Sequence, residues 1–563
     1  MQKPIRNFLP QDFVVSTWDK LEPYFNQLLE RDLQDVSDLE KLLQDRTELE
    51  AVLEEDFAWR YIHSRGDTES AEKQARYNDF VENISPPMSP LSDKLNRKIY
   101  ECDCFSDLDG KVYKTYIRSL KSSIEIFRDE NIPVFTELSK LKTEFNQISG
   151  RQTIVWNGET LTMEQASSKL KDPDRKTREE IYKLMSERRS EDFQSLDDLL
   201  DELITKRQVV ARNADYKNFR DYQFTALERF DYTPEDCENF YVSVRDAIVP
   251  VVRKIQQKRA KKMGLEKLKP WDLKVDASGL SPLKPFKNSR ELIDKTAACF
   301  AAIKPIYGEF IETMDQMGHF DLESRTGKGP GGFNYPLYEC GVPFIYMNSV
   351  GSQRDLETMV HEGGHAIHSF LTQELSLNEF KNTPSEVAEL ASMTMEMISM
   401  PFWDHFYDNS DDLARAQEEK IEDAILTLPW VVMVDQFQNW LYLNDGHTPE
   451  DRVNRWNEIL DDFDTGMIDY TGFEAARGRS WQSQLHIYTV PFYYVEYGFA
   501  QLGALALWKN FCEDRDKALA GYENFMKLGY TKTIPAIYEA AGIEFRFDSD
   551  YIKQLIDFTA QQV

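Results

Sequence analysis

The apolar residues of this chain recur mostly at helical spacing. One clear case begins near Ser37, which precedes Glu40 by three residues, the spacing of a capping box. The apolar positions that follow form a single helical stripe, at Leu39, Leu42, Leu43, Leu49, Val52, Leu53 and Phe57. Similar patterns cover residues 90–128, 131–148 and 172–209. The pattern predicts a mainly α fold.

Strand patterns are few. Two four-residue runs flank Asn157-Gly158, a pair that favours a type I′ hairpin. A second set follows the glycine-rich stretch Thr326–Gly332, at residues 333–338 and 343–348. These runs predict one small sheet just ahead of the most informative helix. The glycine-rich stretch has no phosphate-loop pattern, so we interpret it as a mobile flap.

The segment His361-Glu362-Gly363-Gly364-His365 fits the zinc-peptidase pattern H-E-x-x-H. Ser352 can cap this helix, with Asp355 at the third helical position. Residues four apart are neighbours on one helix face, about 6 Å along the axis, so both imidazoles can meet one zinc. Glu362 then stands beside them as a general base for a zinc-bound water.

A chance match is the alternative, because the motif is short. However, three of the eight histidines fall within residues 351–369. Gly363 and Gly364 also favour the functional interpretation, since each mid-helix glycine costs about 1 kcal/mol unless something packs tightly against it. The sequence therefore predicts a metal site on this helix.

A catalytic zinc needs a third protein ligand and one open position. His368 lies about 10 Å of helix rise from His361, too far to share one ion on a continuous helix. No glycine turn follows His365, so the metzincin arrangement does not apply. We expect His368 to support the site or to face the groove.

A second helix offers a better third ligand. Thr383-Pro384-Ser385-Glu386 predicts a helix start in which Glu386 caps the end. Glu389 then lies in an apolar segment, where a carboxylate needs a strong partner such as zinc. Glu396, two turns further on, could hydrogen-bond a ligating histidine. The alternative is that Glu389 is simply solvated.

Three motifs together resemble the oligoendopeptidase F / thimet oligopeptidase family of zinc metallopeptidases, most closely its oligoendopeptidase F branch. They are HEGGHAIHS, PSEVAELASMTME and WQSQLHIYTVPFYYVEYGFAQLGALALW. The hairpin region and KDPDRKTREEIYKL also resemble that branch. The resemblance covers the chain from about residue 110 to its end.

The resemblance implies an elongated helical body of two lobes around a deep substrate channel, with one Zn²⁺ per chain on the channel floor. It gives His361, His365 and Glu389 as the zinc ligands and Glu362 as the general base. It also implies that residues 344–350 form the edge strand along which a substrate backbone pairs.

The segment after His486 resembles a loop that binds the substrate carbonyl and stabilises its oxyanion. Tyr494 and Tyr497 fit this role best, and Tyr493 is an alternative. Phenol and imidazole donors beside a metal suit such an oxyanion. Part of the aromatic cluster is instead expected to be core.

Composition excludes several other classes of function. The formal net charge of -30 disfavours nucleic-acid and membrane partners. Six cysteines in 563 residues do not form a disulfide framework, and Cys102-Asp103-Cys104 lacks a matching second pair for a metal. The first residues carry no signal-peptide pattern, and no apolar tract reaches the length of a membrane span. We expect a cytoplasmic protein.

We predict three regions: residues 1–110, an N-terminal helical region; residues 111–200, a helical segment with a β-hairpin; and residues 201–563, the zinc peptidase region. The predicted function is hydrolysis of internal bonds in short, unfolded peptides. Alternatives are a zinc carboxypeptidase or peptidyl-dipeptidase on the same fold, and a non-catalytic peptide-binding scaffold. The sequence does not choose among the enzymes, because an arginine or lysine that reads a terminal carboxylate cannot be placed. It also leaves the oligomeric state open.

Overall fold

The computed structural model describes residues 5–325 and 327–562. In the first part of the chain the α-helices are α1 (Trp18–Leu29), α2 (Val36–Gly66), α3 (Ala71–Asp79), α4 (Ser85–Glu101), α5 (Lys114–Ile126), α6 (Asn131–Gly150), α7 (Met163–Lys169), α8 (Arg175–Ser190), α9 (Phe193–Asn213), α10 (Phe219–Ala226), α11 (Pro234–Lys262), α12 (Ser289–Ile303) and α13 (Pro305–Gln316).

Further along they are α14 (Gln353–Thr372), α15 (Asn378–Lys381), α16 (Ser385–Ser399), α17 (Ser410–Leu443), α18 (Pro449–Asp462), α19 (Glu474–Gly478), α20 (Leu485–Thr489), α21 (Tyr494–Glu513), α22 (Arg515–Leu528), α23 (Ile534–Ala540) and α24 (Ser549–Ala560). Short turns of other helix types are η1 (Phe80–Ile84), η2 (Asp103–Asp107), η3 (Pro270–Asp272), η4 (Met400–His405) and η5 (Ser480–Ser483). The predicted mainly α fold is confirmed.

Helix α2 begins two residues before the start that a Ser37 N-cap predicts. Its N-cap is Asp35, whose carboxylate accepts a hydrogen bond from the backbone N–H of Ser37 at 2.9 Å. A carboxylate at this position also interacts favourably with the helix dipole, so the predicted Ser37 capping box is not formed. The predicted apolar stripe is buried, except that Phe57 is half-buried.

The hairpin prediction is confirmed. Strands β1 (Thr153–Trp156) and β2 (Glu159–Thr162) pair antiparallel. Asn157 and Gly158 have φ of 52° and 84°, and two positive φ values in succession characterise a type I′ turn.

The second sheet has the strand order β3–β5–β4, formed by β3 (Phe320–Glu323), β5 (Phe344–Ser349) and β4 (Phe333–Tyr335). Strand β5 is parallel to β3 and antiparallel to β4. The prediction that residues 344–350 form the edge strand is therefore wrong, because the backbone of β5 is paired on both sides. The edge beside α14 is β4, where the Asn334 amide lies 3.5 Å from the Glu362 carbonyl oxygen.

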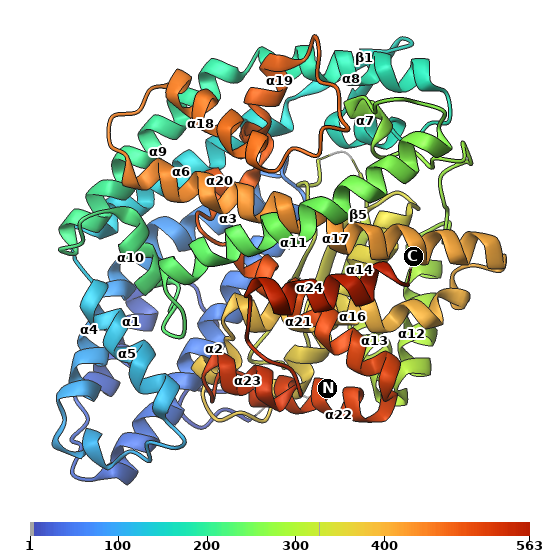
Figure 1. Cartoon of the computed structure of the whole chain (residues 1–563). Coiled ribbons are helices and arrows are strands. Elements are labelled where there is room, and N and C mark those ends of the chain that lie inside the picture. Colours follow the sequence, from blue (N-terminus) through green and yellow to red (C-terminus); the bar gives the residue numbers. More distant parts are fainter. Residues whose placement is uncertain (1–4, 326, 563) are drawn as a thin grey trace.

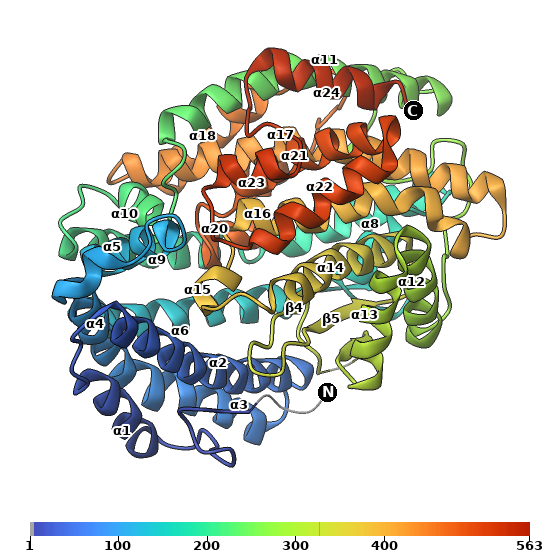
Figure 2. The ribbon, with the colours of Figure 1, turned by 90° about the horizontal axis from the view of Figure 1, so that it is seen from below.

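The apolar residues gather in more than one core. The largest cluster contains the inner faces of α14, α16, α17 and α21. A second cluster holds α1, α2, α4 and α5, together with Leu377 and Phe380 next to and within α15. Figures 1 and 2 both place α1–α5 on one side of the molecule and α12 and α13 on the opposite side. The division at residues 110 and 200 stays a prediction.

In the part of the chain that the structure describes, no helix is both long enough and apolar enough to cross a bilayer.

Candidate metal centre

Helix α14 begins as its sequence predicts. The Ser352 hydroxyl accepts from the backbone N–H of Asp355, and the Asp355 carboxylate accepts in return from the N–H of Ser352. Along the helix, most side chains are buried. A single accessible stripe remains at the spacing of one helix face, through Arg354, Thr358, His361, His365 and Ser369. The two histidines of the motif lie in the middle of this stripe.

The third predicted ligand meets them from α16. Oε2 of Glu389 lies 3.3 Å from Nε2 of His361 and 3.6 Å from Nε2 of His365. Ligand atoms of the three residues all lie within 4.8 Å of one another. Burial alone would raise the pKa of Glu389, but the two imidazoles and the Tyr493 hydroxyl outweigh it and lower that pKa to about 2. The carboxylate is thus ionised, as a metal ligand must be.

Glu396 hydrogen-bonds His361 at the ring nitrogen that does not face Glu389. Its Oε1 lies 2.6 Å from Nδ1 of His361, so the predicted hydrogen bond between Glu396 and a histidine of the motif is confirmed. A carboxylate can only accept, so Nδ1 donates its proton to Glu396, and Nε2, which faces Glu389, is the nitrogen whose lone pair would bind a metal ion. The other carboxylate oxygen of Glu396 pairs with the buried Lys420 of α17. Sequence reasoning missed Lys420, because no local motif distinguishes it from the other charged residues of α17.

The role predicted for Glu386 is wrong. The structure has Pro384 as the N-cap of α16, without a side-chain capping bond. Glu386 is instead buried and accepts a hydrogen bond from the Tyr232 hydroxyl at 2.5 Å. Because Tyr232 is distant in the sequence, local spacing could not reveal that Glu386 bonds to it and does not cap the helix.

Glu362 points toward the strand edge. It is buried, and burial raises the pKa of its carboxyl to about 7. A Cβ placed on Gly332 would lie 3.7 Å from Oε1 of Glu362, so the carboxylate faces the segment that leads into β4. A carboxyl with a pKa near neutrality is suited to accept and return a proton.

The glycine-rich stretch is tied down at its start. Gly329 donates its N–H to the Arg65 carbonyl at 2.7 Å, and the Tyr346 hydroxyl donates to the Gly329 carbonyl at 2.6 Å. Thr326 lies outside the described residues. These bonds hold Gly329 against the end of α2 and against β5. The predicted mobility of the stretch stays a prediction.

One histidine and three tyrosines form an aromatic group next to Glu389. The ring of His486 lies 4.7 Å from that of Tyr494 and 5.8 Å from that of Tyr497, centroid to centroid. Tyr493 donates its hydroxyl to Oε1 of Glu389 at 2.8 Å. Tyr493 thus contacts a candidate metal ligand directly, whereas Tyr494 is hydrogen-bonded with Trp430 and Gln484.

Burial determines the protonation states of His486, Tyr494 and Tyr497. It raises the pKa of Tyr494 to about 12 and that of Tyr497 well above its usual value, with the carboxylates of Glu389 and Glu362 contributing to the second shift. It lowers the pKa of His486 to about 4. The phenols therefore keep their protons and the imidazole is neutral near pH 7, so all three side chains can donate without carrying charge.

His368 is not part of the group of side chains that could hold a metal ion. It is buried and lines a cavity of about 240 Å³ with His365, Glu389, Tyr493, Asn334 and Lys381. This cavity lies toward the C-terminal half of the α14 stripe. His368 therefore faces a cavity that also reaches His365 and Glu389, and its role stays a prediction.

The cysteine pair is a separate feature. Sγ of Cys102 lies 3.1 Å from Sγ of Cys104. Among the described residues, only His361, His365 and Glu389 form a group of three or more histidine, cysteine or carboxylate side chains close enough to hold one metal ion.

A sequence model described as peptidase family M3 matches residues 168–556, and one described as peptidase M3 N-terminal domain matches residues 8–127. The chain belongs to peptidase family M3.

Relatives in this family are distant in sequence. The chain is 23% identical over 410 residues to an oligoendopeptidase F homolog of Borreliella burgdorferi, covering 71% of this chain and 65% of that protein. It is 22% identical over 346 residues to oligopeptidase PepF of Bacillus subtilis, covering 61% and 50%. The matches thus span less than two thirds of these relatives' length.

Solved structures of other proteins share the fold over nearly the whole chain. PZ peptidase A with an inhibitor superposes with a TM-score of 0.92 at 25% identity, covering 98% of this chain and all of that one. The oligoendopeptidase F of Enterococcus faecium superposes with a TM-score of 0.64 at 17% identity, covering 97% and 96%.

Proposed function

We propose that this protein is a zinc-dependent oligoendopeptidase that hydrolyses internal bonds of short, unfolded peptides. The observation that carries the proposal is the convergence of His361, His365 and Glu389 with Glu362 beside them. The relatives named oligoendopeptidase F and oligopeptidase support the same reaction. A cytoplasmic location, and the absence of nucleic-acid or membrane partners, stay predictions from the sequence.

The donor set fits zinc. Two imidazole nitrogens and one carboxylate oxygen match a catalytic zinc site, with the hydrogen bond from His361 to Glu396 fixing the ring that would bind. A zinc ion bound there would act as a Lewis acid on the scissile carbonyl and on the attacking water.

Side chains and backbone groups of the protein would transfer the proton, stabilise the oxyanion and bind the peptide. Glu362 would take the proton of the attacking water and pass it to the leaving amine. His486, Tyr494 and Tyr497 would donate hydrogen bonds to the carbonyl oxygen as negative charge develops on it. The edge of β4 offers backbone groups with which an extended peptide can pair.

Products and metal content test this proposal. Mass spectrometry of a mixed peptide library should show internal cuts, whereas single-residue trimming would indicate a carboxypeptidase and loss of dipeptides a peptidyl-dipeptidase. Metal analysis should find about one zinc per chain. A metal-free protein that binds peptides without cutting them would support the scaffold alternative instead.

A variant separates the base from the metal site. Glu362→Gln keeps the shape of the side chain but cannot accept a proton, so turnover should fall by roughly 10²- to 10⁴-fold with zinc retained. Near-normal kcat would remove Glu362 from the role of base.

A further inference from the structure

The residues proposed to stabilise the oxyanion stand on two different helices. His486 lies in α20, whereas Tyr494 and Tyr497 lie in the first turn of α21. Only residues 490–493 join these two helices. The backbone of this short connection therefore determines how His486 lies relative to the two tyrosines.

Phe492, within this connection, has an unusual backbone conformation. Its φ is 70°, in the left-handed region, and its side chain is fully buried. Asparagine and aspartate adopt this region far more readily than a bulky aromatic residue, for which it is strained. Such strain persists only where surrounding contacts impose it, and it is concentrated at functional sites.

Two buried side chains impose this conformation on Phe492. Its backbone N–H donates to Oε1 of Gln438 in α17 at 2.9 Å, and its carbonyl oxygen accepts from the guanidinium of Arg229. Arg229 precedes α11 and also pairs with Glu496 at 2.8 Å, where both side chains are buried. Because Glu496 belongs to the first turn of α21, one guanidinium binds both the strained connection and the helix that carries the tyrosines.

A second buried arginine holds α20. Arg207 of α9 donates to the carbonyl oxygen of Ile487 at 3.2 Å and to that of Tyr488. It also donates to the Tyr442 hydroxyl at 2.7 Å. With α20 anchored to α9 in this way, a change of the backbone at Phe492 would move the tyrosines relative to His486.

We propose that Arg229 is a positioning residue for the oxyanion donors, an inference that rests on the function proposed above. Arg229 keeps Phe492 in its strained conformation. That conformation sets the distances from the His486 ring to the rings of Tyr494 and Tyr497, which are 4.7 and 5.8 Å between centroids.

The expected effect of this positioning is on turnover. Donors that are fixed before the reaction stabilise the developing oxyanion without a cost of reorganisation. Because negative charge develops on that oxygen only in the transition state, misplaced donors lower kcat and leave substrate binding nearly unchanged.

The test removes Arg229 together with its charged partner, because a buried Glu496 left alone would destabilise the fold. The double variant Arg229→Met/Glu496→Gln should lower kcat by about 10- to 100-fold, with KM within about two-fold of wild type. Zinc content should stay at about one per chain. A phosphinic peptide carries its negative oxygen where the oxyanion forms, so its inhibition constant should rise by the same factor as kcat falls.

Two single variants support the test. Arg229→Lys keeps a donor for both partners and should retain more activity than the double variant. Gln438→Leu removes the other anchor of Phe492 without a change of charge, so it remains informative if the double variant does not fold. It should lower kcat and raise the inhibition constant in the same direction.

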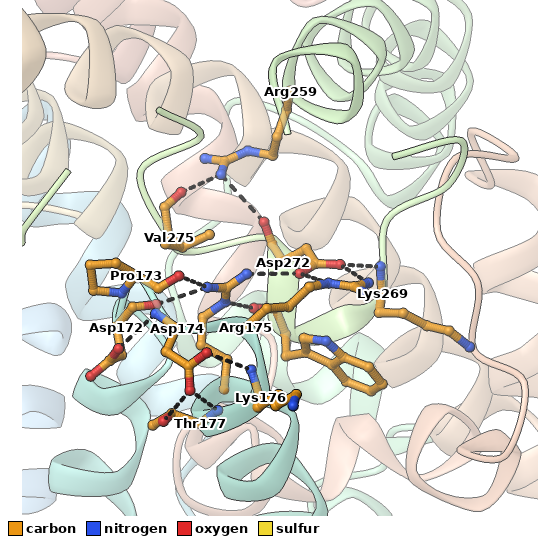
Figure 3. A network of polar contacts seen from close by, with 12 residues as sticks. Asp172, Pro173, Asp174, Arg175, Lys176, Thr177, Arg259, Lys269, Asp272 and Val275 are labelled. Atoms are coloured by element: carbon orange, nitrogen blue, oxygen red, sulfur yellow. Dashed lines mark hydrogen bonds and ion pairs between the residues drawn. The ribbon is translucent and has the colours of Figure 1, made fainter. Parts of the chain in front are cut away.

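A matched control comes from another buried arginine. Arg178 of α8 donates to the Asp272 carboxylate and to the Trp271 carbonyl oxygen, each at 3.0 Å. These bonds belong to the network around Asp272 that Figure 3 shows. Arg178→Met removes a buried arginine with the same two kinds of partner. It should lower the free energy of unfolding but leave kcat and the inhibition constant unchanged.

Three results would overturn the positioning role. The first is wild-type kcat in both the double variant and Gln438→Leu. The second is an equal loss in Arg178→Met, which would trace the effect to a general loosening of the fold. The third is a parallel loss of zinc and activity, which would trace it to Glu389 through Tyr493. A wild-type protein that cleaves no peptide would instead contradict the proposed function.

Discussion

Gln484 donates its amide N–H to Nδ1 of His486 at 2.7 Å. The direction is fixed, because the Trp430 indole N–H donates to the amide oxygen of Gln484 at 2.9 Å and so turns the NH₂ group toward the histidine. Nδ1 of His486 must then accept, and its proton sits on Nε2. The hydrogen bonds thus select the tautomer that can donate to a substrate carbonyl.

Gln484→Leu removes that selection. We expect kcat to fall by about ten-fold with metal content unchanged, since the imidazole loses the partner that orients it. Nitrogen NMR of labelled histidine reports the tautomer directly. A protonated Nδ1 in the wild-type protein would contradict the arrangement, and Trp430→Phe should cause a smaller change of the same kind.

The prediction that Glu389 is the third zinc ligand can be tested against a control variant that should leave zinc binding unchanged. Glu389→Ala removes one of the three donors and should lower zinc occupancy sharply. Glu386→Ala is not a suitable comparison, because its buried carboxylate holds Tyr232. The exposed Glu374 serves instead, and Glu374→Ala should keep full zinc. Metal analysis of both purified variants decides the point, and full zinc without Glu389 would remove that residue from the ligand set.

The glycines of the motif are required by packing. A Cβ on Gly364 would lie 2.7 Å from the Cα of Ser392, and one on Gly363 would lie 2.6 Å from the Phe300 ring. Gly364→Ala should therefore push α14 away from α16, lowering the free energy of unfolding by about 1–3 kcal/mol and weakening metal binding. Chemical denaturation and metal analysis measure both effects. Gly110→Ala, with no atom within 4 Å of the added Cβ, should change neither.

The sequence predicted what local spacing determines and missed what distant contacts determine. The helical stripe, the Ser352 capping box and the Asn157-Gly158 turn follow from neighbouring residues, and the structure has all three. The fate of Glu386 depends on Tyr232, 154 residues away. The position of β5 depends on pairing with β3, a four-residue strand that the hydrophobic pattern does not reveal.

Stability should depend on pH through Asp435, which is 1% exposed. Burial raises the pKa of Asp435 to about 6, against an ordinary value near 4. Between about pH 4 and 6 the unfolded chain releases this proton while the folded chain keeps it, so the contribution is complete below pH 4 and lost as pH rises to 6. The loss amounts to at most about 3 kcal/mol.

Asp435→Asn keeps an acceptor for the Tyr241 hydroxyl but does not titrate. The difference in free energy of unfolding between wild type and this variant should therefore change across pH 4–6 and stay constant above. Asp408→Asn, at an exposed aspartate, should follow the wild-type curve. Parallel curves for wild type and Asp435→Asn would show that Asp435 titrates normally.

Access to the ligands should select unfolded substrates. The side chains of His361 and His365 are only 21% and 19% exposed, and that of Glu389 is 5% exposed. A backbone that pairs with the three residues of β4 must be extended and free of its own hydrogen bonds.

The experiment presents one cleavable sequence to the enzyme in three forms: as a free peptide, as a flexible tail on a stable protein, and as a short loop within that protein. The peptide and the tail should be cut at similar sites, whereas cutting of the loop should be slower by at least about 100-fold, because its ends are held by the fold. Cleavage of all three at one rate would mean that the ligands are open to folded chains, and the requirement for an extended substrate would then be wrong.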